Sequence, residues 1–464
     1  MTGQAGIGRP VLTAAEMRAA EAATIAAGTS VETLMDRAGT AAAHAIRAYA
    51  GAAPALILCG PGNNGGDGYV IARVLREMGT QVRVAALGVP KDGAAVAARE
   101  MWDGPVEELS AATSAPLLVD ALFGTGLSRA LDEGVAARLG ELAGGASVAV
   151  AIDLPSGAAA DDGAILSPVP DYDLTITFGA LKRAHLLQPA ARHMGRLVVA
   201  DIGVPVPGQT MEIARPALPP PGPADHKYSR GYVGVLAGEM PGAAALTASA
   251  ALRSGAGYVR VAAEHALSGI PHAVVQSKGG LADDRRIGAL VVGPGLGRGE
   301  GARQLLTEAL AAPTPLVLDA DALTLLAESG LDGLSRAAST AILTPHAGEF
   351  ARLFPALAGS KVEQALSAAR TAQAVIVYKG PDTVVAAPDG RAAIAPPASH
   401  WLATAGTGDV LAGVIAAMRA AGLDAFEAAR AGVWLHGRAA ALAGPGLIAD
   451  DLLDHLPQAR AECL

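Results

Sequence analysis

Short apolar runs that alternate with helix-like segments restrict the fold of this chain more than any other feature. Residues 54–59 (PALILC), 81–87 (QVRVAAL) and 173–179 (DLTITFG) are strand-like, and residues 68–79 (GYVIARVLREMG) between the first two are helix-like. Strands that are separated by helices predict a parallel sheet with helices on both faces. The same alternation resumes after residue 225, so the sequence predicts two three-layer α/β domains in succession.

A proline-rich stretch, residues 215–225 (RPALPPPGPAD), separates the two alternating regions. Proline clusters of this kind are typical of semi-rigid spacers rather than of packed elements. We therefore predict a first domain at residues 1–214, a linker at residues 215–224 and a second domain at residues 225–464. The chain length of 464 residues is ample for this division.

Composition disfavours several classes of partner. The formal net charge of −9 disfavours nucleic acid and anionic membranes, and 3% aromatic residues offer few rings on which single-stranded bases can stack. The two cysteines, Cys59 and Cys463, cannot build a disulfide framework or a zinc cluster, and Cys59 is expected in the core. No apolar run reaches the ~18 residues of a membrane helix, and the N-terminus lacks a signal-peptide pattern, so a soluble, cytoplasmic protein is expected.

The first strand-like run leads into Gly60-x-Gly62-x-x-Gly65, the spacing of a dinucleotide-binding turn. An NAD-dependent dehydrogenase also needs an acidic residue at the end of the next strand, where it holds the ribose. Here that strand ends in Gly88, and Asp67 at the start of the helix would repel a pyrophosphate unless a cation intervened. An ordinary dehydrogenase is therefore disfavoured, and the glycines alone are also typical of a plain tight turn.

Polar residues follow the later strands of the first domain. Asp120 ends one apolar run (LLVD), and Asp153 and Ser156 follow another (AIDLPSG). Ligands of an open parallel sheet bind beyond the carboxyl ends of its strands, so these oxygens and that of Asn64 can converge on one hard cation. The alternative is that Asp120 and Asp153 only cap the turns or helices that follow them.

A glycine-rich turn in the second domain, residues 402–413 (LATAGTGDVLAG), predicts a phosphate site. Gly406, Thr407 and Gly408 allow backbone N–H groups to point toward one anion at a helix N-terminus. Asp409 in the first helical turn can take a proton from a hydroxyl that attacks the phosphate, although simple helix capping is the alternative for this residue. The chain contains neither GxxxxGKS nor GxxxxGKT, so it is not a P-loop enzyme.

Other positions of the second domain follow strand-like runs and are weaker candidates. Residues 291–299 (VVGPGLGRG) are either a loop that suits close approach of a ligand or a plain loop. Lys379 can hold a nucleotide phosphate or is an ordinary surface lysine, and His346 is as easily structural as functional. Asp319 and Asp321 are candidates for a magnesium site or for loop packing.

Four segments of the first domain, LMDRAG, GPGNNGGDGYVIAR, VDALFGTGLSR and AIDLPSG, occur in this order. Together they resemble the NAD(P)H-hydrate epimerase family over residues 10–210. The resemblance implies a Rossmann-like three-layer domain that interconverts the C6 epimers of hydrated NADH or NADPH. It also implies a potassium ion held by Asn64, Asp120 and Ser156, and Asp153 as the acid or base that contacts the substrate. The substrate-binding residues that it implies are Asp153, Asn63, Asn64, Gly65, Gly66, Asp67, Gly124, Thr125, Gly126, Leu127, Ser128, Arg129 and Ala130.

Residues 224–450 carry a second set of segments: HKYSRGYVGVLAG, GAAALTASAALRSGAGYV, VVGPGLG, LDADAL, TPHAGE, YKGPDT and ATAGTGDVLAG. They resemble the ribokinase-like superfamily and, more closely, the ADP-dependent NAD(P)H-hydrate dehydratases. The resemblance implies a ribokinase-like three-layer α/β domain that uses Mg²⁺ and takes ADP as co-substrate. The residues implied to contact the hydrated nucleotide are Ala243, Gly297, His346 and Asp409. Those implied to contact the adenine nucleotide are Lys379, Gly380, Pro381, Asp382, Thr383 and Gly408.

Two stretches depart from that family's pattern. Asp382 stands where a small residue is expected, and because an acid beside phosphates is unfavourable, its side chain is expected to point outward. Ser399, His400 and Trp401 replace an Asn-Pro-Gly sequence before the glycine-rich turn. The Trp401 ring is expected either to stack on a ligand ring or, more simply, to pack in the core.

The two resemblances predict one function, the repair of hydrated nicotinamide nucleotides. The first domain would interconvert the R and S epimers, and the second would dehydrate the S epimer at the expense of ADP, giving AMP and phosphate. Two alternatives stay open: a ribokinase-type small-molecule kinase with an accessory first domain, and a first domain that only binds nucleotide or supports an oligomer. The expected partners are small molecules, hydrated NADH or NADPH and ADP, in a homo-oligomer without nucleic acid or membrane.

Overall fold

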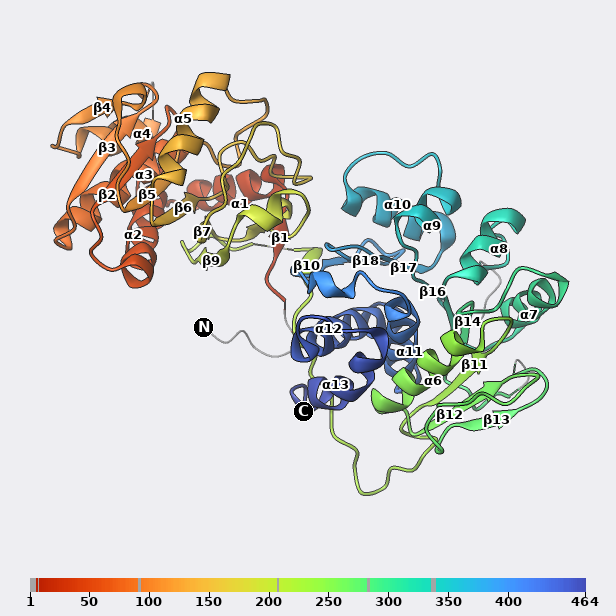
Figure 1. Ribbon diagram of the computed structural model, residues 1–464. Helices are drawn as coiled ribbons and strands as arrows, with labels where there is room; N and C mark the ends of the chain where they lie inside the picture. The colour runs from red at the N-terminus through yellow and green to blue at the C-terminus, as the bar shows by residue number, and fades with distance from the viewer. Residues whose placement is uncertain (1–5, 7, 91–92, 207, 282–283, 335–338) are drawn as a thin grey trace. The chain divides into compact units, whose positions relative to one another are not determined.

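The computed structural model describes residues 6, 8–90, 93–206, 208–281, 284–334 and 339–464 (Figure 1). Across these ranges the chain divides into two compact units, Arg9–Gly208 and Gln209–Leu464, and the second also takes in Gly6 and Gly8. We call them the N-terminal unit and the C-terminal unit. In the ranges given above, no helix is both long and apolar enough to cross a membrane.

The N-terminal unit is built on a parallel sheet, as predicted. Within its described part the sheet has seven strands in the order β4-β3-β2-β5-β6-β7-β9, and each neighbouring pair is parallel. A shorter parallel pair joins β1 to β8. The strands are β1 (Val11–Leu12), β2 (Ala55–Cys59), β3 (Val82–Ala86), β4 (Val106–Glu108), β5 (Leu117–Ala121), β6 (Val148–Ile152), β7 (Leu174–Phe178), β8 (Leu181–Lys182) and β9 (Arg196–Ala200).

Helices cover both faces of this sheet, which explains why β2 is buried along its whole length. Ile57 and Cys59 pack against α1, α2, α3 and α4, whereas Leu56 and Leu58 point to the other face and pack against α5 and η1. The burial of Cys59 confirms its predicted place in the core. The helices are α1 (Ala14–Ala26), α2 (Val31–Ala50), α3 (Asn63–Glu77), α4 (Gly93–Glu100), α5 (Glu133–Gly144), η1 (Leu109–Ala111), η2 (Arg183–His185) and η3 (Ala190–His193).

The C-terminal unit is built on a mixed sheet, in agreement with the predicted ribokinase-like class. In the residues that the structure describes, ten strands follow the order β10-β19-β18-β17-β16-β15-β14-β11-β12-β13. β18 runs antiparallel to β17 and to β19, and the other neighbouring pairs are parallel. The strands are β10 (Thr210–Glu212), β11 (Tyr232–Leu236), β12 (Tyr258–Ala262), β13 (Val275–Ser277), β14 (Ala289–Val292), β15 (Leu316–Leu318), β16 (Ile342–Leu343), β17 (Val375–Tyr378), β18 (Val384–Ala386) and β19 (Ala392–Ile394).

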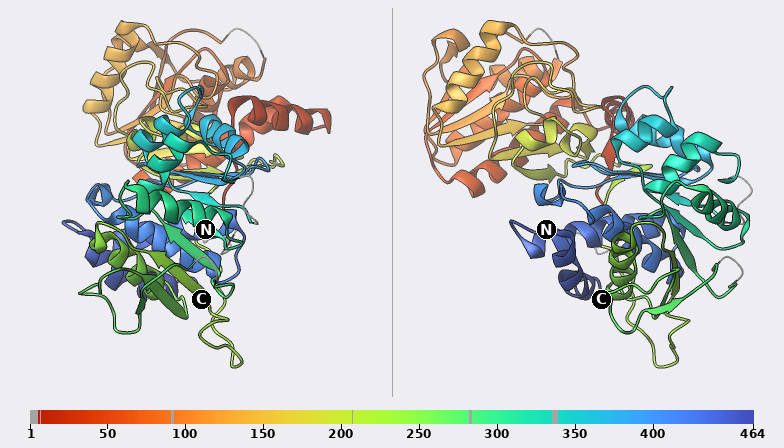
Figure 2. Two further views of the ribbon diagram at one scale, coloured as in Figure 1. Left: turned by 90° about the vertical axis from the view of Figure 1, so that its right-hand side faces the viewer. Right: turned by 45° about the vertical axis from the view of Figure 1, so that its right-hand side comes forward.

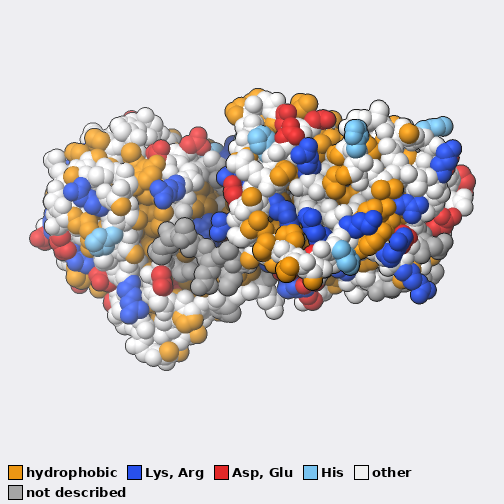
Figure 3. All heavy atoms as spheres, turned by 90° about the horizontal axis from the view of Figure 1, so that it is seen from below, with side chains coloured by type: hydrophobic (Ala, Val, Ile, Leu, Met, Phe, Trp, Pro, Cys, Tyr) orange, Lys and Arg blue, Asp and Glu red, His pale blue; other side chains and the backbone are white. Residues whose placement is uncertain are grey.

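Helices form the outer layers of this unit. α6, α11, α12 and α13 share one hydrophobic core with a face of the sheet. α10 contacts β17 and β18, as α12 does, but from the opposite side (Figure 2). On the face drawn in Figure 3, Lys and Arg side chains are interspersed with acidic and apolar ones. The helices are α6 (Pro241–Arg253), α7 (Glu300–Ala311), α8 (Asp321–Ser329), α9 (Ala347–Leu353), α10 (Lys361–Ala372), α11 (Thr407–Ala420), α12 (Ala425–Ala443), α13 (Ala449–Ala461) and η5 (His400–Leu402).

Strand β10 places the end of the N-terminal unit earlier in the chain than we predicted. We expected the first domain to extend to residue 214, but β10 pairs with β19 of the C-terminal unit. Just after β10, the backbone N–H of Ile213 donates to Ile394 O at 2.8 Å. The N-terminal unit therefore ends at Gly208, because the residues that follow complete the edge of the second sheet.

Candidate active sites

The glycine-rich turn of the N-terminal unit connects β2 to α3, and close packing requires its glycines. A Cβ on Gly60 would lie 1.8 Å from the backbone oxygen of Leu122, and one on Gly65 would lie 1.9 Å from that of Gly60. Gly62 is the N-cap of α3, which begins at Asn63. The unpaired N–H groups of the helix N-terminus therefore lie near the carboxyl ends of β2 and β5.

Asp153 is the centre of a buried polar cluster after β6. Its Oδ1 accepts from Lys182 Nζ at 2.8 Å and from Thr177 Oγ1 at 3.0 Å, and its Oδ2 accepts from the Thr125 N–H at 2.9 Å. Asp153 has a φ of +63°, and His185 Nε2 lies 2.8 Å from its backbone oxygen. Hydrogen bonds thus fix both the side chain and the left-handed backbone of Asp153.

Charge and burial set the protonation of this cluster. Burial opposes ionisation of Asp153, but the Lys182 ammonium outweighs it and lowers the pKa of Asp153 to about 2. Burial and the same lysine lower the pKa of His185 to about 4, so its ring is neutral near pH 7. Burial, with the negative charges of Asp153 and Glu21, raises the pKa of Asp67 well above its ordinary value. The pKa values of the two carboxyl groups are therefore shifted in opposite directions, lowered for Asp153 and raised for Asp67, a pattern that acid–base chemistry uses.

Gly124 brings Asn64 and Asp153 close to each other. A Cβ on Gly124 would lie 2.6 Å from Asp153 Oδ2 and 3.2 Å from Asn64 Oδ1. Asn64 Nδ2 is buried and has no hydrogen-bond partner among the described residues. Because buried polar groups are ordinarily paired, the unsatisfied amide indicates that this side chain meets a ligand.

Asp120 and Ser156 are in contact, as their positions at neighbouring strand ends predicted. Ser156 Oγ donates to Asp120 Oδ1 at 2.7 Å, and Ser156 N donates to Asp120 Oδ2 at 3.0 Å. Tyr172 OH also donates to Oδ2, at 2.5 Å, and Leu122 N donates to Oδ1 at 3.1 Å. Burial raises the pKa of Asp120, although the bonds from Tyr172 and Ser156 oppose this rise. Asp120 therefore caps the turn that follows it, as the structural alternative for this residue predicted. It also binds Ser156, so the two interpretations do not exclude each other.

The oxygens around this point fit a hard monovalent cation such as potassium. Asn64 Oδ1 lies beside Gly124, and Ser156 Oγ lies 3.2 Å from the carbonyl oxygen of Phe123, the residue before Gly124. Amide, hydroxyl, carbonyl and carboxylate oxygens are ligands that hard cations prefer. Asn64, Asp120 and Ser156 are the residues whose oxygens would hold such an ion.

Of the remaining substrate positions predicted for this unit, some lie in α3 or bind Asp153, and others lie in an exposed loop. Gly65, Gly66 and Asp67 lie in the first turns of α3, and Thr125 donates to Asp153. Leu127 N donates to Gly124 O at 3.1 Å, which closes a turn. The other members of that loop are exposed: Gly126, Ser128, Arg129 and Ala130.

Sequence reasoning missed four residues of this site: Tyr172, Thr177, Lys182 and His185. A signal was present, because Lys182 and His185 interrupt a largely apolar run, residues 174–187 (LTITFGALKRAHLL). Charged groups inside such a run need a buried partner. The pattern could therefore have predicted a partner for Lys182, but it could not have identified that partner as Asp153.

The glycine-rich turn of the C-terminal unit starts α11, as predicted. Gly406 is the N-cap and has a φ of +87°. Thr407 Oγ1 lies 3.0 Å from the backbone oxygen of Leu402, and His436 Nε2 of α12 lies 2.9 Å from Thr407 O. Burial lowers the pKa of His436 to about 4, so the neutral ring donates through Nε2. These bonds hold the turn in place and leave the first N–H groups of α11 for a ligand.

Lys379, Asp319 and Gly408 meet at the N-terminus of α11. A Cβ on Gly408 would lie 3.5 Å from Lys379 Nζ and 3.7 Å from Asp319 Oδ2. Lys379 Nζ pairs with Asp319 Oδ1 at 2.8 Å and lies 4.0 Å from Glu349 Oε2, so it is not an ordinary surface lysine. An ammonium and a helix N-terminus that converge on one point form a site for an anion.

Asp409 follows directly in α11 and has a raised pKa. Burial is the main cause of the rise of this pKa to about 6. The negative charge of Asp319 raises the pKa further, the positive charge of Lys379 lowers it, and Asp321 makes a smaller contribution that also raises it. Among the described residues the Asp409 carboxylate accepts no hydrogen bond, so the capping alternative is not supported. A carboxylate with this pKa can accept a proton near neutral pH.

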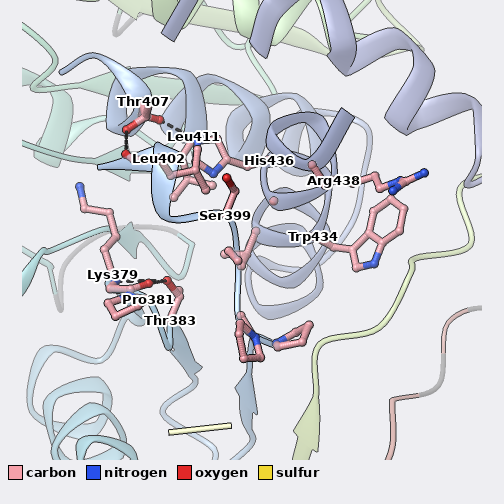
Figure 4. Close-up of a pocket in the computed structure, with 18 of the residues that line it drawn as sticks. Lys379, Pro381, Thr383, Ser399, Leu402, Thr407, Leu411, Trp434, His436 and Arg438 are labelled. Atoms are coloured by element: carbon pink, nitrogen blue, oxygen red, sulfur yellow. Dashed lines mark hydrogen bonds between the residues drawn. The ribbon is translucent and has the colours of Figure 1, made fainter. Parts of the chain in front are cut away.

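A cavity of about 640 Å³ opens beside the anion site (Figure 4). In Figure 4, Lys379, Pro381 and Thr383 come from the segment after β17, and Trp434 and Arg438 come from α12. An apolar chamber next to an anion site suits a molecule that carries a flat ring and phosphates. The apolar part of the lining is formed by Ile213, Ala395, Pro396, Pro397, Ala398, Leu402, Leu411, Val433, Trp434 and Ala441.

The cavity lining collects most of the positions that we expected to contact an adenine nucleotide, with Asp382 as the exception. We expected the Asp382 side chain to point outward, but it is buried and its Oδ1 lies 2.5 Å from Lys361 Nζ. The Lys361 ammonium neutralises the negative charge of Asp382, which would otherwise repel the phosphates of a bound nucleotide. The expected positions in the lining are Lys379, Gly380, Pro381, Thr383 and Gly408.

The positions expected to contact the hydrated nucleotide are outside this lining. The Ala243 Cβ lies 3.0 Å from the Cβ position of Gly295, so α6 borders the glycine loop. In that loop Gly297 N donates to Asp321 Oδ2 at 2.9 Å. His346 Nδ1 accepts backbone N–H groups of α9, so it caps this helix while its side chain stays exposed.

Asp319 and Asp321 have different partners, Lys379 and the Gly297 loop. In the part of the chain that the structure describes, no three His, Cys, Asp or Glu side chains converge as a metal site. Magnesium that arrives with a nucleotide takes most of its ligands from phosphates and water, so Asp319 beside the anion site fits as a protein ligand. Trp401 is 53% exposed, so the expectation that it packs in the core was wrong.

Comparisons with known proteins show the family to which this chain belongs. A family model described as NAD(P)H-hydrate dehydratase matches residues 233–458, and one described as YjeF-related protein N-terminus matches residues 31–184. The bifunctional NAD(P)H-hydrate repair enzyme Nnr of Thermofilum pendens is 36% identical and covers 93% of this chain and 92% of its own. The protein of that name in Salinibacter ruber is 35% identical and covers 98% and 96%.

A solved structure of the ADP/ATP-dependent NAD(P)H-hydrate dehydratase from Bacillus subtilis, co-crystallised with ATP and Mg²⁺, is 30% identical, with a TM-score of 0.47. It covers 53% of this chain and 95% of that chain. Because the matches to the repair enzymes span nearly the whole chain, the chain belongs to the family of bifunctional NAD(P)H-hydrate repair enzymes.

Proposed function

We propose that the chain repairs hydrated NADH and NADPH in two steps, one in each unit. The N-terminal unit interconverts the R and S epimers at C6, and the C-terminal unit dehydrates the S epimer with ADP, which yields AMP and phosphate. The observation that carries the proposal is the meeting of Lys379, Gly408 and Asp409 at one helix N-terminus, beside a cavity of about 640 Å³. Family membership supports both halves.

In the C-terminal unit, the adenine nucleotide occupies the cavity. Its base lies against the apolar lining, and its phosphates reach Lys379 and the N–H groups around Gly408. The segment Gly380–Thr383 contributes to the same site, where Asp382 acts through its pairing with Lys361. The hydrated nucleotide approaches Asp409 from the side of α6 and the glycine loop, where it contacts Ala243, Gly297 and His346.

Dehydration then begins at Asp409. Its carboxylate takes the proton of the C6 hydroxyl, whose oxygen attacks the terminal phosphorus of ADP. The bond from that phosphorus to the bridging oxygen breaks, and AMP leaves. The phosphate on C6 then departs with its bonding electrons, and loss of a proton from C5 restores the C5=C6 double bond. Asp319 is the protein carboxylate that would hold magnesium, which would neutralise phosphate charge.

In the N-terminal unit, the substrate lies over Gly124, between the start of α3 and the loop after β5. The residues proposed to bind it are Asn63, Asn64, Gly65, Gly66, Asp67, Gly124, Thr125, Gly126, Leu127, Ser128, Arg129, Ala130 and Asp153. These residues are proposed because of where they lie: they belong to the two segments that flank Asp153 Oδ2 at the carboxyl edge of the sheet.

Epimerisation at C6 requires a base and an acid, and Asp153 and Asp67 supply them. Asp153 accepts the proton of the C6 hydroxyl as the bond between C6 and N1 breaks, and Asp67 protonates N1. Rotation about the bond between C5 and C6, followed by the reverse steps, closes the ring on the other face. Asn64, Asp120 and Ser156 would hold a potassium ion, which would supply positive charge beside the reacting groups.

A two-phase recovery experiment tests both halves. The full chain is mixed with both hydrate epimers, ADP and Mg²⁺, and the return of dihydronicotinamide absorbance is followed. We expect a rapid phase with the amplitude of the S fraction, then a slower phase in which the R fraction is recovered faster than in buffer. Asp409→Asn should remove both phases, whereas Asp153→Asn should leave the rapid phase unchanged and slow the enzymatic part of the slow phase strongly, to a small residual rate.

Exposed aspartates provide the matched controls. Asp389→Asn in the C-terminal unit and Asp162→Asn in the N-terminal unit remove a charge from a surface turn, so both phases should persist. A stable phosphorylated product without recovered dihydronicotinamide would instead establish a plain kinase. Recovery of the S fraction alone by the unaltered chain would show that the N-terminal unit is not an epimerase. A homo-oligomer and a cytoplasmic location stay predictions.

A further inference from the structure

A lysine is buried behind the carboxylate of the N-terminal site. Lys182 is 2% exposed, and its ammonium lies 2.8 Å from Asp153 Oδ1, 2.8 Å from Thr177 Oγ1, 3.1 Å from Phe178 O and 3.3 Å from Ala180 O. Lysine is almost never fully buried unless it is paired, because removing its charge from water is costly. Asp153 is the anionic partner that this ammonium meets.

The two oxygens of Asp153 have different surroundings. Lys182 and Thr177 bind Oδ1, on the inner side. Oδ2 accepts the N–H of Thr125 and lies over Gly124, on the side of the proposed substrate. Lys182 therefore fixes the carboxylate from behind and leaves its other oxygen directed toward the reacting groups.

The segment that carries Lys182 also fixes the backbone of Asp153. Lys182 N donates to His185 Nδ1 at 2.8 Å, which leaves the proton of the neutral ring on Nε2. His185 Nε2 in turn donates to Asp153 O at 2.8 Å. Because Asp153 has a φ of +63°, its backbone would relax readily without such support. One short segment, residues 182–185, thus restrains both parts of Asp153.

We propose that Lys182 is a positioning residue of the epimerase, which holds Asp153 as a carboxylate with Oδ2 facing the substrate. This inference rests on the function proposed for the N-terminal unit. Lys182 acts through Asp153 and does not touch the substrate. Its loss therefore lowers kcat for the R epimer and has little effect on KM, because the groups that bind the nucleotide lie in other segments.

The experiment uses the full chain and the two-phase recovery of mixed epimers. Lys182→Met should slow the enzymatic slow phase about 100-fold through kcat, the scale of a misplaced catalytic group. The amplitude and rate of the rapid phase should stay unchanged, because they report the C-terminal unit. Lys182→Arg keeps a charge behind Asp153 and should recover most of the lost rate. Arg196→Met, a change at an exposed cation of β9, is the matched control and should alter neither phase.

A second background separates positioning from a merely structural role. In Asp153→Asn, the added change Lys182→Met should slow the remaining activity less than about twofold, because the residue through which lysine acts is already neutral. Equal slowing in both backgrounds, or an unchanged rate in Lys182→Met, would overturn the inference. The double variant also removes both buried charges together, so it leaves no buried charge without its partner and guards against a loss of rate that comes only from destabilisation.

Failure of the underlying function gives a different result. If the unaltered chain recovers the R fraction no faster than buffer does, the N-terminal unit is not an epimerase. If it does recover that fraction and Lys182→Met is folded and equally fast, only the role of Lys182 is wrong. Thermal unfolding of each variant identifies any loss of rate that comes from an unfolded N-terminal unit.

Discussion

The ionisation of Asp409 should control the pH dependence of dehydration. Its pKa is raised from 3.8 to about 6, first by burial and then by the negative charge of Asp319. A rise of about two units corresponds to about 3 kcal/mol of opposition to the charged form. Because Asp409 acts as a base, the protonated form is inactive, and activity should be lost as the pH falls through about 6.

The expected size of the effect follows from simple titration. With a pKa of about 6, roughly nine-tenths of Asp409 is ionised at pH ~7 and roughly one-eleventh at pH ~5, so kcat should fall about tenfold. With the ordinary pKa of 3.8, more than about nine-tenths would still be ionised at pH ~5, and kcat would scarcely change. The difference between these two outcomes is large enough for an initial-rate measurement.

The assay uses the purified S epimer with saturating ADP and Mg²⁺, and it records initial recovery of dihydronicotinamide at each pH. ADP also titrates in this range, so a variant is needed to attribute the midpoint to Asp409. Asp319→Asn removes a neighbouring negative charge and frees Lys379, and both effects lower the pKa of Asp409. The midpoint should therefore move to lower pH, whereas Asp389→Asn in a surface turn should leave it in place. A flat profile in the unaltered chain, or an unmoved midpoint in Asp319→Asn, would refute the reasoning.

Three further outcomes are expected. In Gly124→Ala the new Cβ would lie 2.6 Å from Asp153 Oδ2, so epimerisation should slow about 100-fold while the rapid phase of recovery persists; an unaffected slow phase would show that the substrate does not lie there. Tyr172→Phe removes a donor to the buried Asp120 carboxylate and should lower the free energy of unfolding of the N-terminal unit by about 1–3 kcal/mol in urea, whereas Tyr49→Phe at an exposed ring of the same unit should have little effect. Replacement of K⁺ by tetramethylammonium should slow only the epimerase phase, and equal slowing of both phases would contradict the proposed ion site.

Strand order made part of the N-terminal site predictable. The carboxyl ends of parallel strands share one edge, so Asp120 and Ser156 could be expected to meet, and they do at 2.7 Å. Lys182 and His185 could not be placed in the same way, because their positions depend on the turn after β7 and on the short pair of β1 with β8. Hydrophobic periodicity defines strands but not the path of irregular segments between them.

In the C-terminal unit, the sequence predicted the turn before α11 but not the electrostatic partners around it. The glycines located the helix N-terminus, and Lys379 was predicted separately, as a candidate phosphate ligand after a strand-like run. The pairings of Lys379 with Asp319 and of Asp382 with Lys361 join side chains that are distant in sequence, so no local pattern encodes them. We expected the Asp382 side chain to point outward because its charge was considered alone. The prediction was wrong because Lys361 neutralises that charge in the buried position.

The proline-rich stretch is not the place at which the chain can be divided into its two units. β10 completes the sheet edge at β19, and Ile213 just beyond it forms part of the wall of the cavity. If the gene were divided at the proline-rich stretch, the C-terminal product would lack β10 at the edge of its sheet and Ile213 in the wall of its cavity. The N-terminal product would carry β10 without the strand that it pairs with. The boundary between the two compact units lies between Gly208 and Gln209.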